Sequence, residues 1–158
     1  MSGQVLAFRD PETTGGRETL LDSLVDLHTL ITLDPLLGAS PVRIYFVLNP
    51  QARRRIAECL DASDRSRTRL PPAFALVAYD FPFALHIAQT NGPHVDSQRA
   101  TEIVKRSAGL QGDALRAAAG AFDLGTQPVA AFDAGALKTT FFPYTQETVT
   151  HLFRITPC

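Results

Sequence analysis

The stretch Gly109–Asp133, GLQGDALRAAAGAFDLGTQPVAAFD, is the most informative part of this chain. Its apolar residues recur at three- and four-residue spacing, which predicts a helix with one buried face. These residues are Leu110, Ala114, Leu115, Ala118, Ala121 and Phe122. The small side chains of residues 117–120 would let another backbone approach closely, as in a core or a subunit interface. Gly125 is predicted to end the helix in the left-handed conformation, and Pro128 prevents the helix from resuming.

Outside this stretch, the chain is predicted to contain both helices and strands. The runs Val42–Leu48 and Phe74–Tyr79 are apolar without alternation, as in strands that are covered on both faces. A third strand, Thr148–Thr156, would place Val149, His151, Phe153 and Ile155 on one face. A helix is predicted over residues 18–33, with Leu20, Leu24, Leu27 and Ile31 on one face, and another over 50–60, started by Asn49 and Pro50. A helix over 98–106 would continue into the stretch quoted first. Residues 134–140 are predicted to form a short helix or turn, and residues 80–96 an irregular segment with a short helical turn.

This order of elements predicts an α+β fold in which a small central sheet is covered by helices. Residues 1–16 carry glycines, threonines and Pro11, and they are predicted to form an N-terminal arm or loop. Residues 17–158 are predicted to form a single domain. Because the recognisable strands make a thin sheet for this length, we expect a dimer to complete the core.

The composition is that of a globular protein with its own hydrophobic core. Of the 158 residues, 45% are hydrophobic and 20% are charged, and the net charge is −1. This charge gives no field that would favour nucleic acid or an anionic membrane. No apolar run approaches the roughly 20 residues that a transmembrane helix needs. Cys59 and Cys158 have no metal-binding spacing, which favours a reduced, cytoplasmic setting.

Three residues are candidates for acid–base catalysis. His94 lies two positions before Asp96, and a carboxylate can orient an imidazole and raise its pKa. Tyr79, at the end of a predicted strand, is a candidate proton donor. The alternatives are that His94 and Asp96 are solvated loop residues and that Tyr79 is a packing residue. The chain has no glycine-rich phosphate motif, HExxH helix or cysteine pair, so no metal site is expected.

Several cations are candidates for binding an anionic group. Arg65 and Arg67 lie in a polar loop at a spacing of two, which would place both on one side of an extended segment. Such a run is more often simply solvated. Arg17 lies near the end of a predicted element. Arg43 lies at the start of a buried strand, where a charge must find a partner.

Three segments together resemble the nitroreductase superfamily, and in particular its malonic semialdehyde reductase branch. They are SPVRIYFV at residues 40–47, LPPAFALVAYDFPF at residues 70–83, and the stretch quoted first. In the last of these, the family's pattern of a long helix followed by an LGL…GP…GFD loop is matched in register. The matching residues are Gln111, Leu115, Ala121, Leu124, Thr126, Pro128, Phe132 and Asp133.

The resemblance implies an intertwined homodimer that binds FMN at the subunit interface and passes hydride from NAD(P)H to a small organic acceptor. It also implies that the loop formed by Pro128, Val129, Ala130 and Phe132 would face the isoalloxazine ring. The turn that contains Ser40 would approach the ring or the ribityl chain of the flavin.

The chain departs from this family at two flavin anchors. The arginine-rich arm of the family is replaced by residues 11–14, PETT, and the turn over residues 36–40 has lost its asparagine. A phosphate dianion without cationic or N–H partners is strongly disfavoured. Arg17, Arg65 and Arg67 are the residues that would compensate.

Three hypotheses for the function follow, and the missing anchors favour the first. The protein would be a flavin-independent enzyme that acts on a small metabolite in the vacated flavin cleft, using His94, Asp96, Tyr79, Arg43 and Ser40. The second hypothesis is an FMN-dependent NAD(P)H oxidoreductase. The third is a non-catalytic subunit that pairs with a fuller homologue, which would supply the missing arginines.

Overall fold

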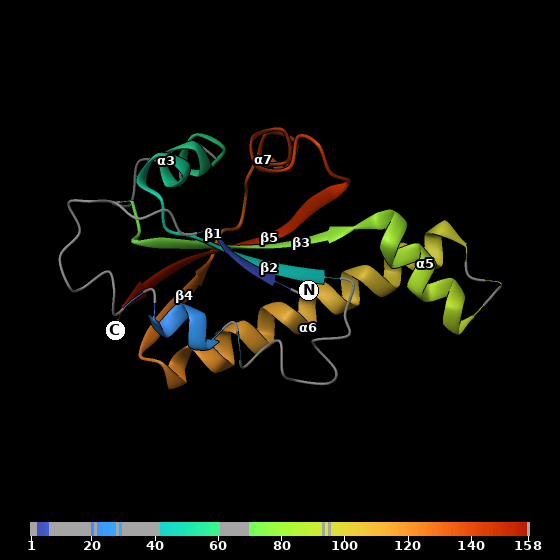
Figure 1. The fold of residues 1–158 in the computed structure, drawn as a ribbon, viewed down its shortest axis with the longest axis horizontal. Coiled ribbons are helices and arrows are strands. Elements are labelled where there is room, and N and C mark those ends of the chain that lie inside the picture. The colour runs from blue at the N-terminus through green and yellow to red at the C-terminus, as the bar shows by residue number, and fades with distance from the viewer. Residues whose placement is uncertain are drawn as a thin grey trace.

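A mixed five-stranded sheet with helices on both faces forms the centre of the protein (Figure 1). The computed structural model describes residues 3–6, 20, 22–27, 29, 42–60, 70–92, 94 and 96–157. The elements are β1 (Gly3–Leu6), β2 (Val42–Val47), α3 (Pro50–Glu58), β3 (Ala73–Asp80), α5 (Phe81–Asn91), α6 (Ser97–Ala121), β4 (Leu124–Pro128), α7 (Ala134–Phe141) and β5 (Glu147–Pro157). The described residues among 20–29 are helical as well. The predicted α+β class is therefore confirmed.

The strand order is β1-β2-β3-β5-β4, with β1 parallel to β2 and every other pair antiparallel. The two continuous apolar runs of the sequence form β2 and β3, in which Ile44 pairs with Val77. Both strands are almost entirely buried, as their lack of alternation predicts. Two further strands were not predicted. β1 lies within the segment expected to be an arm, and β4 lies within the loop expected after the long helix.

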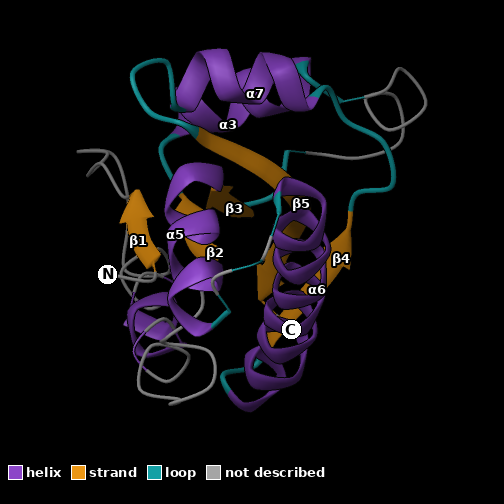
Figure 2. Cartoon of the chain, turned by 90° about the vertical axis from the view of Figure 1, so that its right-hand side faces the viewer, coloured by secondary structure: helices purple, strands orange, loops and turns teal. Residues whose placement is uncertain are grey.

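Each face of the sheet carries its own core, so the molecule has three layers (Figure 2). On one face, α6 and the helical residues 20 and 22–27 cover Ile44, Val77 and Phe153, and Ala84 of α5 joins the same core at the end of β3 (Figure 1). Leu20, Leu24 and Leu27 are buried there, as their spacing predicts. Ile31, predicted on the same stripe, lies outside the described residues. On the other face, α3 and α7 cover a second cluster that includes Tyr45, Leu76 and Leu152.

A β-bulge in β5 divides that strand between the two cores. Val77 of β3 pairs with His151 and Ala78 pairs with Val149, so the ladder skips Thr150. An extra residue of this kind shifts the alternation of a strand by one position. Val149 therefore packs in the cluster beneath α3 and α7, whereas Phe153 and Ile155 pack in the opposite cluster. The prediction that Val149 shares a face with His151, Phe153 and Ile155 was wrong for this reason.

The segment over residues 80–96, predicted to be irregular with a short helical turn, contains the 11-residue helix α5. The Asp80 carboxylate accepts a hydrogen bond of 3.1 Å from the backbone N–H of Phe83 and so caps the first turn. Pro82 is tolerated because the first N–H groups of a helix have no partner within the helix. Pro82 and Gly92 mark the boundaries of this helix and do not interrupt it.

The helix α6 joins the helix predicted over residues 98–106 to the helical stretch quoted first, and its buried face matches the predicted stripe in part. Leu115 is buried, and Ala118 and Phe122 pack against the core, as predicted. The buried residues of α6 also include Val104 and Ala108, whereas Leu110 is 57% exposed and Ala121 is exposed. Asp123, with a φ of 57°, takes the left-handed conformation that was predicted for Gly125. Gly125 lies in β4 instead.

The glycines of α6 lie in two kinds of surroundings. A Cβ added at Gly112 would lie 3.2 Å from the Phe153 ring, whereas one added at Gly109 or Gly120 would meet nothing within 4 Å. Of these three positions, only Gly112 is therefore packed closely enough for an added Cβ to press on a neighbouring side chain. In the part of the chain that the structure describes, no helix is long and apolar enough to cross a membrane.

Candidate functional site

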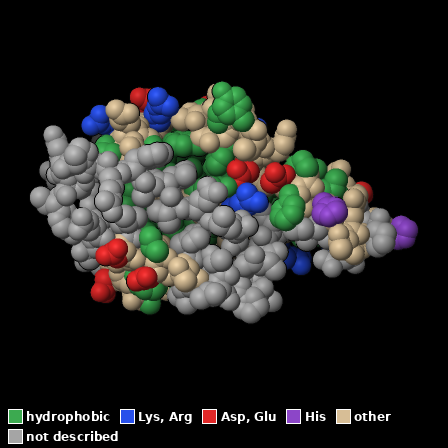
Figure 3. Space-filling view, in the orientation of Figure 1, with side chains coloured by type: hydrophobic (Ala, Val, Ile, Leu, Met, Phe, Trp, Pro, Cys, Tyr) green, Lys and Arg blue, Asp and Glu red, His purple; other side chains and the backbone are tan. Residues whose placement is uncertain are grey.

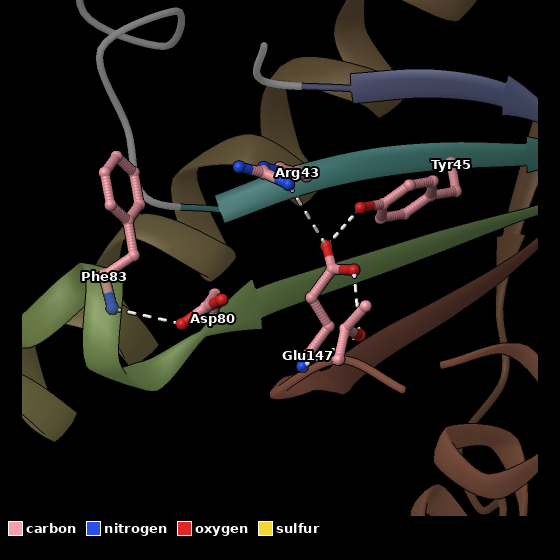
Figure 4. Close-up of polar contacts among 6 residues, drawn as sticks. Arg43, Tyr45, Asp80, Phe83 and Glu147 are labelled. Atoms are coloured by element: carbon pink, nitrogen blue, oxygen red, sulfur yellow. Dashed lines mark hydrogen bonds and ion pairs between the residues drawn. The ribbon is translucent and has the colours of Figure 1, made fainter. Parts of the chain in front are cut away.

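A cluster of polar side chains lies where β2 begins and β5 begins (Figure 4). Glu147, the first residue of β5, is 5% exposed, and its Oε1 accepts a hydrogen bond from the Tyr45 hydroxyl. The same oxygen lies 3.7 Å from Nη1 of Arg43. Arg43 and Tyr45 are two residues apart on β2, so a strand places both side chains on one face. Arg43 has thus found the partner that its position in the sequence requires.

The residues before β5 hold Glu147 in place. The Thr145 hydroxyl lies 3.3 Å from Oε2 of Glu147, and the Glu147 N–H lies 3.4 Å from the Thr145 hydroxyl. Lys138 of α7 donates from Nζ to the backbone oxygens of Thr145 and Glu147, at 3.0 and 3.1 Å. Arg43 and Lys138, the two cations next to Glu147, therefore already have partners within this cluster. Figure 3 shows side chains of both signs close together near the middle of one face.

The surroundings of Tyr45 keep its phenol protonated. Burial raises the pKa of Tyr45 from 10.0 to about 12, and the hydrogen bond to Glu147 adds to the increase. The nearby Arg43 opposes the increase, but its effect is smaller. The Tyr45 ring also packs against Phe142, with the ring centroids 5.1 Å apart. This cluster is thus a hydrogen-bonded partly buried network in which Tyr45 is a donor and Glu147 an acceptor.

The loop between β4 and α7 is anchored to the sheet and to α3. The backbone N–H of Val129 donates to the oxygen of Leu152 at 2.9 Å, and Val129 is buried. Phe132 forms an isolated bridge with Leu60, and the N–H of Asp133 donates to the oxygen of Cys59 at 2.8 Å. The loop therefore has a fixed backbone at both ends.

Between these anchors, the loop presents small surface residues. Pro128, Ala130 and Ala131 are exposed. Among the described residues, none accepts a hydrogen bond from the backbone N–H of Ala130 or Ala131. Two small side chains and two available amide donors suit the close approach of a flat polar ring.

The predicted acid–base residues lie away from both features. His94 is exposed in a turn, and Asp96 is the N-cap of α6, where its carboxylate accepts from the N–H of Arg99 at 2.8 Å. Between His94 and Asp96, which are both described, the structure shows no hydrogen bond. Tyr79 is half-buried and packs against the core beneath α6.

The remaining predicted residues divide between the two groups and the undescribed part of the chain. Arg43 belongs to the polar cluster, and Pro128, Val129, Ala130 and Phe132 belong to the loop. Ser40, Arg17, Arg65 and Arg67 lie outside the described residues. Within the described ranges, no group of three or more His, Cys, Asp or Glu residues is placed to hold a metal ion.

Neither Glu147 nor Lys138 was predicted from the sequence as a site residue. The signal that points to Glu147 is indirect, because a charge at the start of a buried strand requires a partner, but the sequence does not show which residue that partner is. Lys138 binds backbone oxygens, a role that its residue type does not indicate.

Solved structures of nitroreductase family proteins share this fold. A nitroreductase family protein from Streptococcus pneumoniae aligns with a TM-score of 0.66 at 14% identity, over 96% of this chain and 84% of that chain. An Exiguobacterium sibiricum structure, described as a "putative nitroreductase in complex with FMN", aligns with a TM-score of 0.67 at 14% identity, over 94% of this chain and 81% of that chain. The architecture is therefore that of the nitroreductases.

Sequence comparison identifies the family. No protein-family model matches the chain. A Ralstonia nicotianae protein named "Putative NADH dehydrogenase/NAD(P)H nitroreductase" is 33% identical over 138 residues, which cover 78% of this chain and 70% of that protein. A protein of the same name from Polynucleobacter asymbioticus is 28% identical, over 77% of this chain and 66% of that protein, so just under two thirds of its length is spanned. The chain belongs to the nitroreductase family.

Proposed function

We propose that this protein is an FMN-dependent NAD(P)H oxidoreductase. The observation that carries the proposal is the anchored loop over residues 128–133, on a chain that is 33% identical to a protein named as an NAD(P)H nitroreductase. This was the second of the three hypotheses drawn from the sequence. It is preferred here because the loop offers what a flavin ring needs, whereas no acid–base pair has formed at His94 and Asp96.

The residues of the loop fit a flavin ring. Pro128, Ala130 and Ala131 would contact the ring, and the N–H groups of the two alanines would donate to its polar edge. Val129 and Phe132 would hold the loop at the distance that this contact requires, because both pack on the core beneath α7. When bound, FMN would supply hydride transfer between NAD(P)H and an acceptor.

The phosphate of FMN would be held by residues outside the described ranges. Arg17, Arg65 and Arg67 are assigned this role, and Ser40 is assigned to the ribityl side of the site. Arg43 and Lys138 are less suitable, because both are engaged at Glu147. The sites would lie at the interface of a homodimer, as the resemblance to the family implies. Pairing with a longer homologue is the alternative assembly.

The acceptor in this proposal is a small carbonyl compound. The sequence resembles the malonic semialdehyde reductase branch, whose substrate type is an aldehyde on a short carboxylic acid. Arg17, Arg65 and Arg67 would then compete for two anions, the cofactor phosphate and the acceptor carboxylate. A comparison of short aldehydes with and without a carboxylate measures whether the acid group contributes to kcat/KM.

Titration of the purified protein with FMN tests the proposal directly. We expect quenching of flavin fluorescence with a stoichiometry of one FMN per chain, and NAD(P)H oxidation only when FMN is present. Sedimentation analysis of the same sample should give the mass of a dimer. A protein that takes up no FMN, yet still converts a small metabolite, would overturn the proposal in favour of the flavin-independent hypothesis. Inactivity that is relieved only by a co-purifying longer homologue would favour the non-catalytic subunit.

A further inference from the structure

His151 lies at the edge of the sheet, directly beyond the last pair of β4 and β5. That pair joins Pro128 to Phe153, and the N–H of Val129 then bonds to the oxygen of Leu152. Among the described strands, only β3 pairs with β5 at His151. The side chain is half-buried, and its ring is stacked on Phe153 with the two planes 10° apart and the centroids 6.4 Å apart.

Two hydrogen bonds decide which nitrogen of His151 carries a proton. The Thr150 hydroxyl donates to the backbone oxygen of Val77 at 3.1 Å. A hydroxyl has one hydrogen, so Thr150 has none left for its second contact, which is with Nδ1 of His151 at 3.0 Å. Nδ1 must therefore be the donor in that contact. In the neutral imidazole, Nε2 is then the unprotonated nitrogen.

The bulge is what makes this arrangement possible. Because the ladder skips Thr150, its side chain is free to reach the oxygen of Val77 while it also meets the ring of the next residue. Stacking on Phe153 adds a second restraint on the ring. His151 is thus held in one orientation, with Nδ1 protonated in both charge states, so that only Nε2 gains or loses a proton.

We propose that His151 gives a proton to the oxygen of the carbonyl acceptor, and that it exchanges protons only at Nε2. The proposal rests on the proposed function, which places the reacting ring against Pro128 and Ala130. His151 lies on the same face of β5 as Phe153, and Phe153 is the partner of Pro128 across the ladder. The imidazole is therefore at the margin of the loop that would face the ring.

The reduction balances with His151 in this role. The carbon of the carbonyl group gains a hydride whose electron pair comes from NAD(P)H, and the π bond to oxygen breaks. The oxygen takes the proton from Nε2 of the His151 imidazolium, which leaves an alcohol and a neutral imidazole. Nδ1 keeps its proton, which remains in the hydrogen bond to the Thr150 hydroxyl. A proton from water then protonates Nε2 again. Thr150 acts as a positioning residue, since it works through His151.

Nitrogen-15 NMR of the protein tests the tautomer, with or without FMN. We expect neutral His151 to carry its proton on Nδ1, and we expect Thr150→Val to move the population towards the Nε2–H form. Valine is chosen because it is β-branched and of similar shape, so the bulge is retained. A wild-type signal dominated by the Nε2–H form would overturn the proposal. Thr150→Val leaving the tautomer unchanged would overturn the role of Thr150.

Stopped-flow kinetics tests the proton role. In His151→Phe, which keeps a stacking ring, reoxidation of the flavin by a carbonyl acceptor should slow by about 100-fold or more, as expected for loss of a general acid. Reduction by NAD(P)H should change less than twofold. His151→Gln is a second variant in case the first fails to fold, and His86→Gln, at an exposed position on α5, is the control.

The two proposals fail in different ways. Bound FMN with unchanged reoxidation in both His151 variants would overturn the proton role and leave the oxidoreductase intact. Absence of FMN binding would overturn the proposed function and, with it, the proton role.

Discussion

Arg43 of β2 and Glu147 of β5 meet at 3.7 Å across the strand that separates them. Adjacent strands are about 4.8 Å apart, so the two side chains must span roughly twice that distance over β3. The β3 residue paired with Arg43 is Ala78, which is fully buried and leaves room above the sheet. Tyr45 reaches the same carboxylate from β2. One carboxylate thus connects β5 to β2 across β3, at the end of the sheet near α5.

Replacing Glu147 with Ala should lower the free energy of unfolding by about 2–4 kcal/mol, because it leaves the Tyr45 hydroxyl and Arg43 without their acceptor. Urea denaturation measures the loss. The matched control is Glu102→Ala, which removes an ion pair with Arg99 that is shorter, at 3.2 Å, but exposed on both sides. Glu102→Ala should lower the free energy of unfolding by at most about 0.5 kcal/mol. Equal losses in the two variants would contradict the role assigned to Glu147.

The Tyr45 phenol should make stability depend on pH at the alkaline end. Its pKa is 10.0 in the unfolded chain and about 12 in the folded protein, so folding favours the protonated form. The stability from this group is fully present below pH 10 and is lost as the pH rises from 10 to 12. Tyr45→Phe removes this contribution. The difference in unfolding free energy between wild type and variant should therefore shrink over that interval, and a constant difference would contradict the assignment.

Ala130→Leu should weaken FMN binding by about tenfold or more, because a branched side chain would occupy the space needed by the ring. Stability should change by less than about 0.5 kcal/mol, since the position is exposed. Isothermal titration with FMN gives the affinity, and thermal unfolding without FMN checks the fold. Thr139→Leu, at an exposed position on α7, is the control and should bind FMN as wild type does.

Asp96 has a structural role that can be separated from catalysis. As the N-cap of α6 it accepts a hydrogen bond from Arg99, and asparagine caps a helix as well as aspartate does. Asp96→Ala should lower the free energy of unfolding by about 1 kcal/mol, whereas Asp96→Asn should lower it by a few tenths of a kcal/mol at most. Asp96→Asn should also keep the oxidoreductase activity. Loss of activity in a stable Asp96→Asn protein would instead support the acid–base role predicted from the sequence.

The glycines of α6 should respond differently to the same substitution. Gly109→Ala should stabilise the protein by about 1 kcal/mol, because alanine is the better helix former and its Cβ meets nothing within 4 Å. Gly112→Ala should stabilise the protein less than Gly109→Ala does, because the added Cβ would lie only 3.2 Å from the Phe153 ring. Denaturant unfolding at several protein concentrations measures both. A destabilising, concentration-dependent effect of Gly109→Ala would show that a second chain packs at this position.

The sequence predicts the parts of this fold that depend on local pattern. The apolar runs of β2 and β3 and the N-terminal proline of α3 are local features, and the structure contains all three elements. The need of Arg43 for a partner could also be predicted, because a charge at the start of a buried strand requires compensation in any fold. The identity of that partner could not, since it depends on how β2 and β5 are placed around β3.

The errors have a common physical origin in tertiary contacts. The alternation of side chains along β5 shifts by one residue at Thr150 because of how β5 pairs with β3. The sequence of β5 by itself does not indicate this shift. The inward face of α6 is set by the sheet beneath it, which buries Ala108 and Gly112 and leaves Leu110 exposed. Of the candidate site, the loop residues 128–132 were predicted from the family resemblance. The contact between Thr150 and His151 could not be predicted, because it depends on the bulge in β5.

The place of β5 in the sheet has a consequence for synthesis of the protein. β5 lies between β3 and β4, although it is translated after all the other strands that the structure describes. A ribosome adds about 5–20 residues per second, so β5 is synthesised several seconds after β3 is complete. During that time, one edge of a buried apolar strand is open to other nascent chains. We therefore expect the yield of folded protein in cells to depend on chaperones that bind exposed strands, more than its final stability would indicate.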